Sequence, residues 1–168
     1  MLDSGIFYTL LSDAGVTLFA GVPDSLLKDF CAYVTDHAPA ERHVITANEG
    51  SAIGLAAGHH LGTGELALVY LQNSGLGNVV NPVTSLADPA VYGVPMLLVI
   101  GWRGEPGKKD EPQHVKMGSV TAPLLDALGV AWHELPADLE GARRAVANAA
   151  RQARDTAAPV ALLVRRGT

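Results

Sequence analysis

Short apolar runs alternate along this chain with longer segments in which apolar residues recur every three or four positions. Runs such as "LALVYL" and "MLLVI" contain no polar alternation. Strands of that kind are buried on both faces, as in a parallel sheet covered by helices. The pattern predicts strands at residues 16–20, 43–47, 66–71, 95–100, 130–134 and 159–164.

The intervals between these strands predict helices, with glycines and capping residues at their ends. The first helix should end at Gly15, and the second follows "GVPDS", where Asp24 or Ser25 could cap its first turn. Helices are expected at about 3–14, after residue 25, from Glu49 onward, and at 76–88, 119–128 and 137–154. The alternation predicts a doubly wound α/β fold with a six-stranded, mainly parallel sheet, in one domain spanning residues 1–168.

One long irregular stretch interrupts this alternation. The segment "GWRGEPGKKDEPQHVKMG", residues 101–118, contains two prolines, four glycines and charges of both signs. Long loops of this kind after a central strand are either functional or disordered. We expect this loop to be mobile in the absence of a partner.

Composition narrows the possible classes of protein. Charged residues make up only 17% of the chain and the net charge is −5, which argues against nucleic-acid binding and hints at surface covered by another subunit. A single cysteine, Cys31, excludes an internal disulfide and suggests a reduced, cytoplasmic protein. The acidic N-terminus lacks the features of a signal peptide, and no apolar run is long enough for a membrane span.

The unusual polar residues concentrate just after the predicted strands. These segments are "GVPDS", "NEGS", "QNSGLGN" and "GWRGEPG" with the following "DEPQH". In open α/β sheets ligands bind at this edge, beyond the carboxyl ends of the strands. A dinucleotide site would require G-x-G-x-x-G after the first strand and a P-loop would require GK[ST], and neither motif occurs there.

Each of these features also has a purely structural interpretation. Glu49 could be a first-turn residue favoured by the helix dipole, and "QNSGLGN" could be an ordinary turn between a strand and a helix. His114 could be a solvated loop residue, whereas His59 and His60 suit a surface or an interface better than a metal site. Only the combination of segments favours a functional site.

The segments "ANEGSAIGLAAGHHLGTG", "YLQNSGLGNVVNPVTSLADP" and "GWRGEPGKKDEPQH" resemble the thiamine-diphosphate-dependent decarboxylases. Within that family the similarity is to the phosphonopyruvate and sulfopyruvate decarboxylases, over about residues 5–165. The family's active site forms between a pyrimidine-binding (Pyr) and a diphosphate-binding (PP) domain. The resemblance implies that residues 1–168 form the Pyr domain alone, in the thiamine-diphosphate-binding fold.

The resemblance also implies roles for individual residues. Glu49 would be the catalytic acid that bonds N1′ of the aminopyrimidine and favours its imino tautomer, which allows C2 of the thiazolium to lose its proton. Arg103, Lys108 and Lys109 lie near His114 in the sequence and could meet an anionic substrate. The cofactor-binding residues would be Pro23, Glu49, Gln72, Asn73, Ser74 and Gly75, and the substrate-binding residues Asp24, Ser25, Asn73 and His114.

The sequence departs from the family pattern at one important motif. The family binds Mg²⁺ and the diphosphate through G-D-G followed by Asn, and no "GDG" occurs in the 168 residues. The resemblance therefore implies no metal ligand in this chain and a PP-domain β subunit that carries the GDG…N motif. We expect an α–β hetero-oligomer, with α–α contacts possible, that is inactive without the β subunit; a fragment of a longer single-chain enzyme is the alternative.

Three functions remain open from the sequence. The favoured one is a subunit that decarboxylates phosphonopyruvate to phosphonoacetaldehyde, with the sulfopyruvate reaction to sulfoacetaldehyde as the alternative for a small anionic 2-oxo acid. The second is a non-catalytic accessory subunit that has kept the fold. The third is a free-standing binding module of flavodoxin-like shape, which would lack a site for the diphosphate.

Overall fold

Six strands alternate with helices along the chain in the computed structural model, which describes residues 2–168. The strands are β1 (Val16–Gly21), β2 (His43–Ile45), β3 (Leu66–Gln72), β4 (Met96–Gly101), β5 (Ala131–Glu134) and β6 (Pro159–Val164). The α-helices are α1 (Ser4–Asp13), α2 (Lys28–His37), α3 (Glu49–Thr63), α4 (Leu76–Pro82), α5 (Pro112–Ala127) and α6 (Leu139–Thr156). Short helical turns cover Ala40–Arg42, Asn73–Gly75 and Val83–Ala87.

The strands form one sheet in the order β2-β1-β3-β4-β6-β5. Every neighbouring pair is parallel, and the central pair β3–β4 aligns Leu68 with Leu97 and Gln72 with Gly101. The doubly wound fold predicted from the apolar runs is therefore confirmed, and the sheet is wholly rather than mainly parallel.

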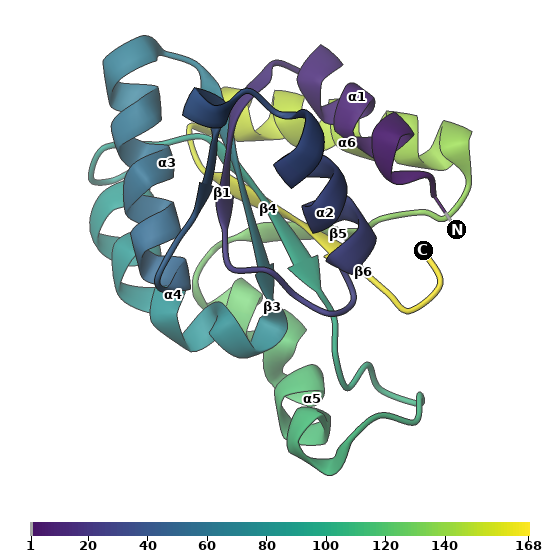
Figure 1. Cartoon of the computed structure of the whole chain (residues 1–168). Helices are drawn as coiled ribbons and strands as arrows, with labels where there is room; N and C mark the ends of the chain where they lie inside the picture. The colour runs from purple at the N-terminus through teal and green to yellow at the C-terminus, as the bar shows by residue number, and fades with distance from the viewer. Residues whose placement is uncertain (1) are drawn as a thin grey trace.

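Helices cover both faces of the sheet (Figure 1). Alternate residues of each central strand point to opposite faces, so Leu68 and Leu97 pack with helices α1, α2 and α6, whereas Val69 and Leu98 pack with α3, α4 and α5. Strands β3, β4 and β6 are buried along almost their whole length. This double burial explains why their sequences show no polar alternation.

The structure corrects four predicted boundaries. Helix α5 begins at Pro112 instead of residue 119, so most of "DEPQHVKMG" is helical rather than loop. Neither Asp24 nor Ser25 caps α2, which begins at Lys28 without a side-chain cap. Strand β2 ends at residue 45 instead of residue 47. The predicted helix 76–88 is divided into α4 and a wider π-helical turn at Val83–Ala87, which begins directly after Pro82.

Two glycines explain why α5 begins early. Trp102 Nε1 donates to the carbonyl of Gly118, 2.9 Å away, which ties α5 to the end of β4. A Cβ at Gly118 would lie 1.7 Å from the carbonyl oxygen of Gly104, and one at Gly104 would lie 2.0 Å from that of His114. Backbone therefore packs directly on backbone, and α5 lies beyond the carboxyl ends of the central strands (Figure 1).

Candidate active site

Glu49 is the first residue of α3 and one of the few buried charged side chains among residues 2–168, with 9% of its surface exposed. Asn48 caps the helix through a 2.9 Å hydrogen bond from Ser51 N to its Oδ1, so the helix begins with Glu49 in its first turn. The Nδ2 group of Asn78, on α4, donates to Glu49 Oε2 at 2.6 Å. This bond leaves Oε1 available as an acceptor at the carboxyl edge of the sheet.

Two glycines make room for the Glu49 carboxylate. A Cβ at Gly75 would lie 2.4 Å from Cδ and from Oε1 of Glu49, so the side chain rests directly on the glycine backbone. A Cβ at Gly50 would lie 2.7 Å from the carbonyl oxygen of Asn78, so α3 and α4 also approach closely there. The small residues at these positions therefore have a steric reason within the chain.

Asn73 is completely buried and ties three elements together. Its Nδ2 donates to the carbonyl of Arg103 at 2.8 Å and to Thr121 Oγ1 at 2.9 Å, and its Oδ1 accepts from Arg103 N at 3.2 Å. Both amide hydrogens are thus used inside the protein. These contacts favour a positioning role, and the substrate contact expected for Asn73 stays a prediction.

Asp24 lies over the carboxyl end of β4 with only 5% of its surface exposed. Its Oδ2 accepts from Leu26 N at 3.0 Å, while its Oδ1 is buried without a hydrogen-bond partner among residues 2–168. Burial raises the pKa of this carboxyl, against the lowering effect of backbone N–H groups and of Arg103. Glycine is needed at position 101, because a Cβ there would lie 2.1 Å from Asp24 Oδ2.

Arg103 connects the loop after β1 with the loop after β4. Its NH1 group donates to Ser25 Oγ at 2.7 Å, and its Nε and NH2 groups donate to the two oxygens of Asp110 at 2.9 and 2.6 Å. Asp110 also accepts from Gly104 N and Glu111 N, and lies 3.2 Å from His114 Nδ1. The bonds from Arg103 are the main cause that holds the pKa of Asp110 far below its ordinary value.

The remaining predicted residues are more open. Pro23, Ser25 and Ser74 are exposed, and Gln72 Nε2 donates to Ser74 Oγ at 2.9 Å. The structure brings Glu49 together with Gly75, Asn73 with Arg103, and Ser25 with His114 through Arg103 and Asp110.

Sequence reasoning missed Asn78, Asp110 and Thr121 as partners of the predicted residues. The one available signal was the place of Asn78 near the start of a helix that follows a strand end, beside the segment already singled out.

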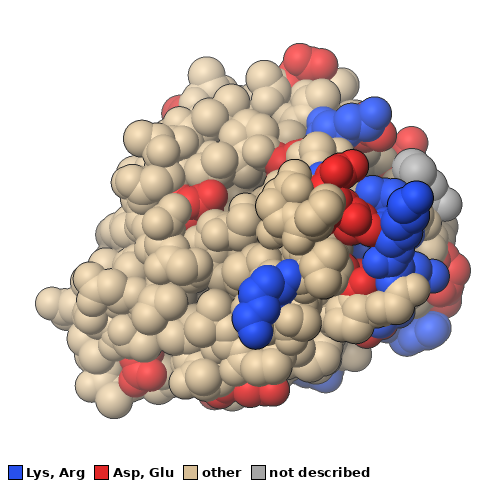
Figure 2. Space-filling view, turned by 90° about the horizontal axis from the view of Figure 1, so that it is seen from below, with Lys and Arg blue, Asp and Glu red and all other residues tan. Residues whose placement is uncertain are grey.

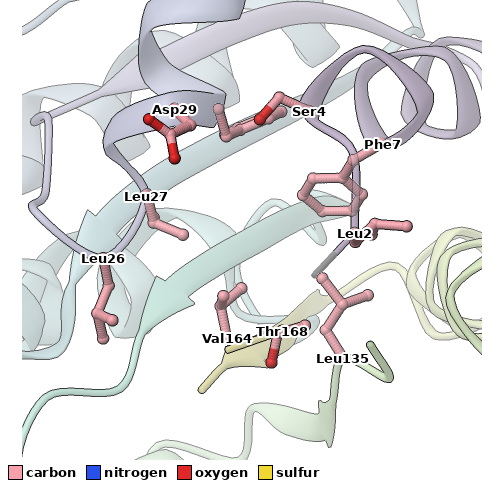
Figure 3. A pocket seen from close by; sticks show the side chains of 10 residues that line it. Leu2, Ser4, Phe7, Leu26, Leu27, Asp29, Leu135, Val164 and Thr168 are labelled. Atoms are coloured by element: carbon pink, nitrogen blue, oxygen red, sulfur yellow. The ribbon is translucent and has the colours of Figure 1, made fainter. Parts of the chain in front are cut away.

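An apolar pocket of about 70 Å³ lies near the site but contains none of the predicted site residues (Figure 3). It opens between α1, α2 and the end of β6, and its lining consists of Leu2, Ser4, Phe7, Leu26, Leu27, Asp29, Phe30, Leu135, Val164 and Thr168.

Within residues 2–168, no group of three or more His, Cys, Asp or Glu side chains is arranged to hold a metal ion. None of the helices in that range combines the length and apolar character needed to cross a membrane.

The fold and the residues at this edge define a family. Residues 4–130 match the model of the thiamine pyrophosphate enzymes, N-terminal TPP binding domain, and the chain belongs to this family. The resemblance inferred from the strand-end motifs is therefore confirmed.

Individual relatives sharpen the comparison. The chain is 46% identical to the phosphonopyruvate decarboxylase of Streptomyces viridochromogenes over 75% of its own length and 31% of that protein. It is 32% identical to the sulfopyruvate decarboxylase subunit alpha of Methanococcus maripaludis over 98% of its own length and 95% of that protein. The thiamine diphosphate-dependent 4-hydroxybenzoylformate decarboxylase of Rhodococcus jostii RHA1 superposes with a TM-score of 0.72 at 27% identity, over 99% of this chain and 30% of that one.

The lengths of these relatives differ greatly. The chain spans about a third of the phosphonopyruvate decarboxylases that it matches, at 31% and 33% of their lengths. It spans nearly all of the sulfopyruvate decarboxylase alpha subunits from two methanogens, at 95% and 93%. The chain is therefore more similar in sequence to the phosphonopyruvate decarboxylases, whereas its length agrees better with that of the sulfopyruvate decarboxylase alpha subunits.

Proposed function

We propose that this chain supplies the pyrimidine-binding half of a thiamine-diphosphate-dependent 2-oxo acid decarboxylase, with phosphonopyruvate as the favoured substrate. The observation that carries the proposal is the Glu49 carboxylate, which is held at the start of α3 by Asn78 and accommodated by Gly75. A carboxyl group fixed in this way at the ligand-binding edge of an α/β sheet could bond N1′ of an aminopyrimidine, as donor to the amino tautomer or as acceptor from N1′–H of the imino tautomer.

The residues at this edge fit the cofactor's pyrimidine. Glu49 Oε2 is bonded to Asn78, and Oε1 rests on Gly75, whose missing side chain leaves room for the carboxylate. When bound, thiamine diphosphate supplies the carbanion-stabilising chemistry that decarboxylation of a 2-oxo acid needs. Glu49 would accept the hydrogen bond from N1′–H of the imino tautomer, and the exposed Ser74 and half-buried Gln72 could line the ring.

The charge distribution supports an anionic substrate. Six of the twelve Lys and Arg residues border two adjoining hollows at the strand ends, of about 240 and 350 Å³, in a chain whose net charge is −5. Figure 2 shows basic side chains gathered toward one side of this face, with acidic ones among them. The six residues are Lys28, Arg103, Lys108, Lys109, Arg165 and Arg166.

The six cations are not equally available. Arg103 is occupied by Asp110 and Ser25. The guanidinium of Arg165 donates to Glu134 and forms an ion pair with Glu105. Lys108 and Lys109 are exposed on the same loop as Asp110, so they are better placed to meet a phosphonate or sulfonate than Arg103 is. A doubly charged phosphonate would gain more from this field than a sulfonate.

A PP domain would complete the site. Residues 1–168 contain no "GDG", so we infer that Mg²⁺ and the diphosphate are held by a PP domain, most simply on a β subunit. The relatives from methanogens that match nearly the whole length carry the name subunit alpha, which supports such a division. Their agreement in length also keeps sulfopyruvate as the alternative substrate.

The test is to co-express the chain with a PP subunit that carries the GDG…N motif. The purified complex is then assayed for aldehyde with phosphonopyruvate and with sulfopyruvate, in thiamine diphosphate and Mg²⁺. We expect aldehyde from phosphonopyruvate, at a kcat/KM above that for sulfopyruvate, and no turnover by the chain alone.

Glu49→Gln provides the decisive variant, because it keeps the shape of the side chain and its acceptor oxygen but removes the charge. Turnover should fall on the order of 10²-fold or more. Glu41→Gln, an exposed residue in the turn before β2, makes the same change of charge away from the site and should leave turnover unchanged. A complex that processes neither substrate, or one in which Glu49→Gln keeps full activity, would show that the proposal is wrong.

A further inference from the structure

We propose that Asp110 is a positioning residue that holds His114 with its proton on Nδ1, so that Nε2 is left as the proton-transfer atom of the site. The inference rests on the proposed decarboxylation, and it assigns to that site a His–Asp pair built on the loop after β4 and the first turn of α5.

The hydrogen-bond partners of Asp110 determine the tautomer of His114. The two carboxylate oxygens face Arg103 Nε at 2.9 Å, Arg103 NH2 at 2.6 Å, Gly104 N at 2.8 Å and Glu111 N at 2.8 Å. All four groups can only donate, so the carboxylate is ionised and can only accept. His114 Nδ1, 3.2 Å from Oδ1, must therefore carry a hydrogen in order to bond.

The opposite ring nitrogen is free of such a bond. No hydrogen bond joins His114 Nε2 to any of the residues 2–168, and 16% of the side chain is exposed. In neutral imidazole one nitrogen donates and the other accepts. With Nδ1–H on Asp110, Nε2 has a lone pair that takes up a proton and, in the protonated ring, a hydrogen that it can donate.

The position of the pair is fixed from three directions. Gly104 and Gly118 let α5 pack on the backbone after β4, and Trp102 Nε1 bonds the carbonyl of Gly118 at 2.9 Å. Asn73 holds both backbone groups of Arg103, and Asn73 belongs to the same turn as Gly75, on which the Glu49 carboxylate rests. A short run of contacts thus links the pair to the proposed catalytic acid.

The stoichiometry of the proposed reaction requires a proton donor. A 2-oxo acid anion that becomes an aldehyde loses carbon dioxide and gains one hydrogen on the former carbonyl carbon. The protonated ring of His114 can give the proton on Nε2 to that carbon and become the neutral Nδ1–H tautomer, after which water returns a proton to Nε2. Asp110 keeps its charge and its five hydrogen bonds throughout.

The first test reads the tautomer directly and needs no activity. The full chain is labelled with ¹⁵N-histidine, and ring nitrogens are correlated with ring protons at about pH 8, above the ordinary imidazole pKa of about 6.5. His114 is assigned by the signal lost in His114→Gln. We expect the Nδ1–H form to dominate in the wild type and the Nε2–H form to gain in Asp110→Asn.

Glu111→Gln is the matched control for this spectrum. It removes a neighbouring negative charge whose side chain is exposed, while the backbone bond from residue 111 to Asp110 is kept. The tautomer should remain Nδ1–H. A wild-type ring with its hydrogen mainly on Nε2 overturns the proposal even if Asp110→Asn fails to fold, and so does an unchanged tautomer in a folded Asp110→Asn chain.

The second test measures turnover in the assembled enzyme. His114→Gln should lower kcat on the order of 10²-fold, and Asp110→Asn at least about tenfold, with KM changed by less than about threefold. Because Asp110 acts through His114, the double variant should be no slower than His114→Gln alone. Additive losses would refute the positioning role.

The two tests separate two kinds of failure. A wild-type complex without decarboxylase activity would refute the proposed function, whereas the tautomer spectrum would still decide whether Asp110 orients His114.

Discussion

Replacing Gly75 with alanine would move the Glu49 carboxylate without changing Glu49 itself. A Cβ at position 75 would lie 2.4 Å from Cδ and Oε1 of Glu49, about 1 Å or more inside an ordinary contact distance. Because the glutamate side chain is flexible and the glycine backbone is not, the carboxylate must rotate away. The 2.6 Å hydrogen bond from Asn78 would then be lost.

In Gly75→Ala the expected loss of turnover is much larger than the expected loss of stability. Loss of a hydrogen bond to a charged group costs about 1.5–3 kcal/mol, and replacing glycine by alanine returns up to ~1 kcal/mol through the unfolded state. The chain should therefore remain folded, with a net loss of about 0.5–3 kcal/mol. Turnover depends on the position of the carboxylate and should fall about 10²-fold.

Thermal unfolding of the chain and aldehyde production by the complex measure the two effects. Gly77→Ala is the matched control, since a Cβ there meets nothing within 4 Å. It should leave the Glu49 carboxylate in place and lower turnover less than Gly75→Ala does. If Gly75→Ala turned over at the wild-type rate, or if Gly77→Ala lost as much activity, the steric account of Glu49 would be wrong.

Two further predictions concern the stability of the isolated chain. Asp24→Asn should raise the free energy of unfolding by about 1 kcal/mol at neutral pH, because it removes a buried charge with an unpartnered oxygen. Since burial raises the pKa of Asp24 in the folded state, the gain should be absent below about pH 4 and should grow as the pH rises above that value. Urea titrations at neutral pH and below about pH 4 measure this gain in the free energy of unfolding. Asp36→Asn, at an exposed position, is the control and should change the free energy of unfolding little. Gly58→Ala should stabilise the isolated chain by about 0.5–1 kcal/mol, because nothing lies within 4 Å of a Cβ at that position. If the proposed PP subunit packs against α3, the same change should weaken assembly of the proposed complex. Sedimentation of the complex measures the second effect, and tighter assembly would contradict it.

The sequence predicted the fold well because the sheet is buried on both faces. Continuous apolar runs such as residues 66–71 and Pro159–Val164 are typical of strands covered on both faces, and the helices follow from what must cover them. The start of α5 could not be predicted in this way. Its first turns are exposed and polar, and they are fixed by contact of backbone with the loop after β4, which leaves no periodic pattern.

The location of the site could be predicted from the sequence, but the hydrogen bonds between its residues could not. Glu49 and the strand-end loops follow from the rule that ligands bind at the carboxyl edge of an α/β sheet. The sequence places Asn73 and Arg103 far apart and suggests that both are free to meet a ligand. Their mutual hydrogen bonds depend on how two loops and α5 approach in space, which no spacing of residues encodes.

The glycines of α3 and its neighbours divide into two groups with different causes. Gly50 and Gly75 are required inside the chain, because a Cβ at either position would overlap Asn78 or Glu49. Gly54, Gly58 and Gly62 have no neighbour within 4 Å of a Cβ, although each glycine in a helix costs about 1 kcal/mol relative to alanine. A partner subunit that packs closely against this side of α3 would compensate that cost. The two measurements on Gly58→Ala distinguish such an interface from a helix that merely tolerates glycine, since only an interface makes the stabilised chain assemble less well.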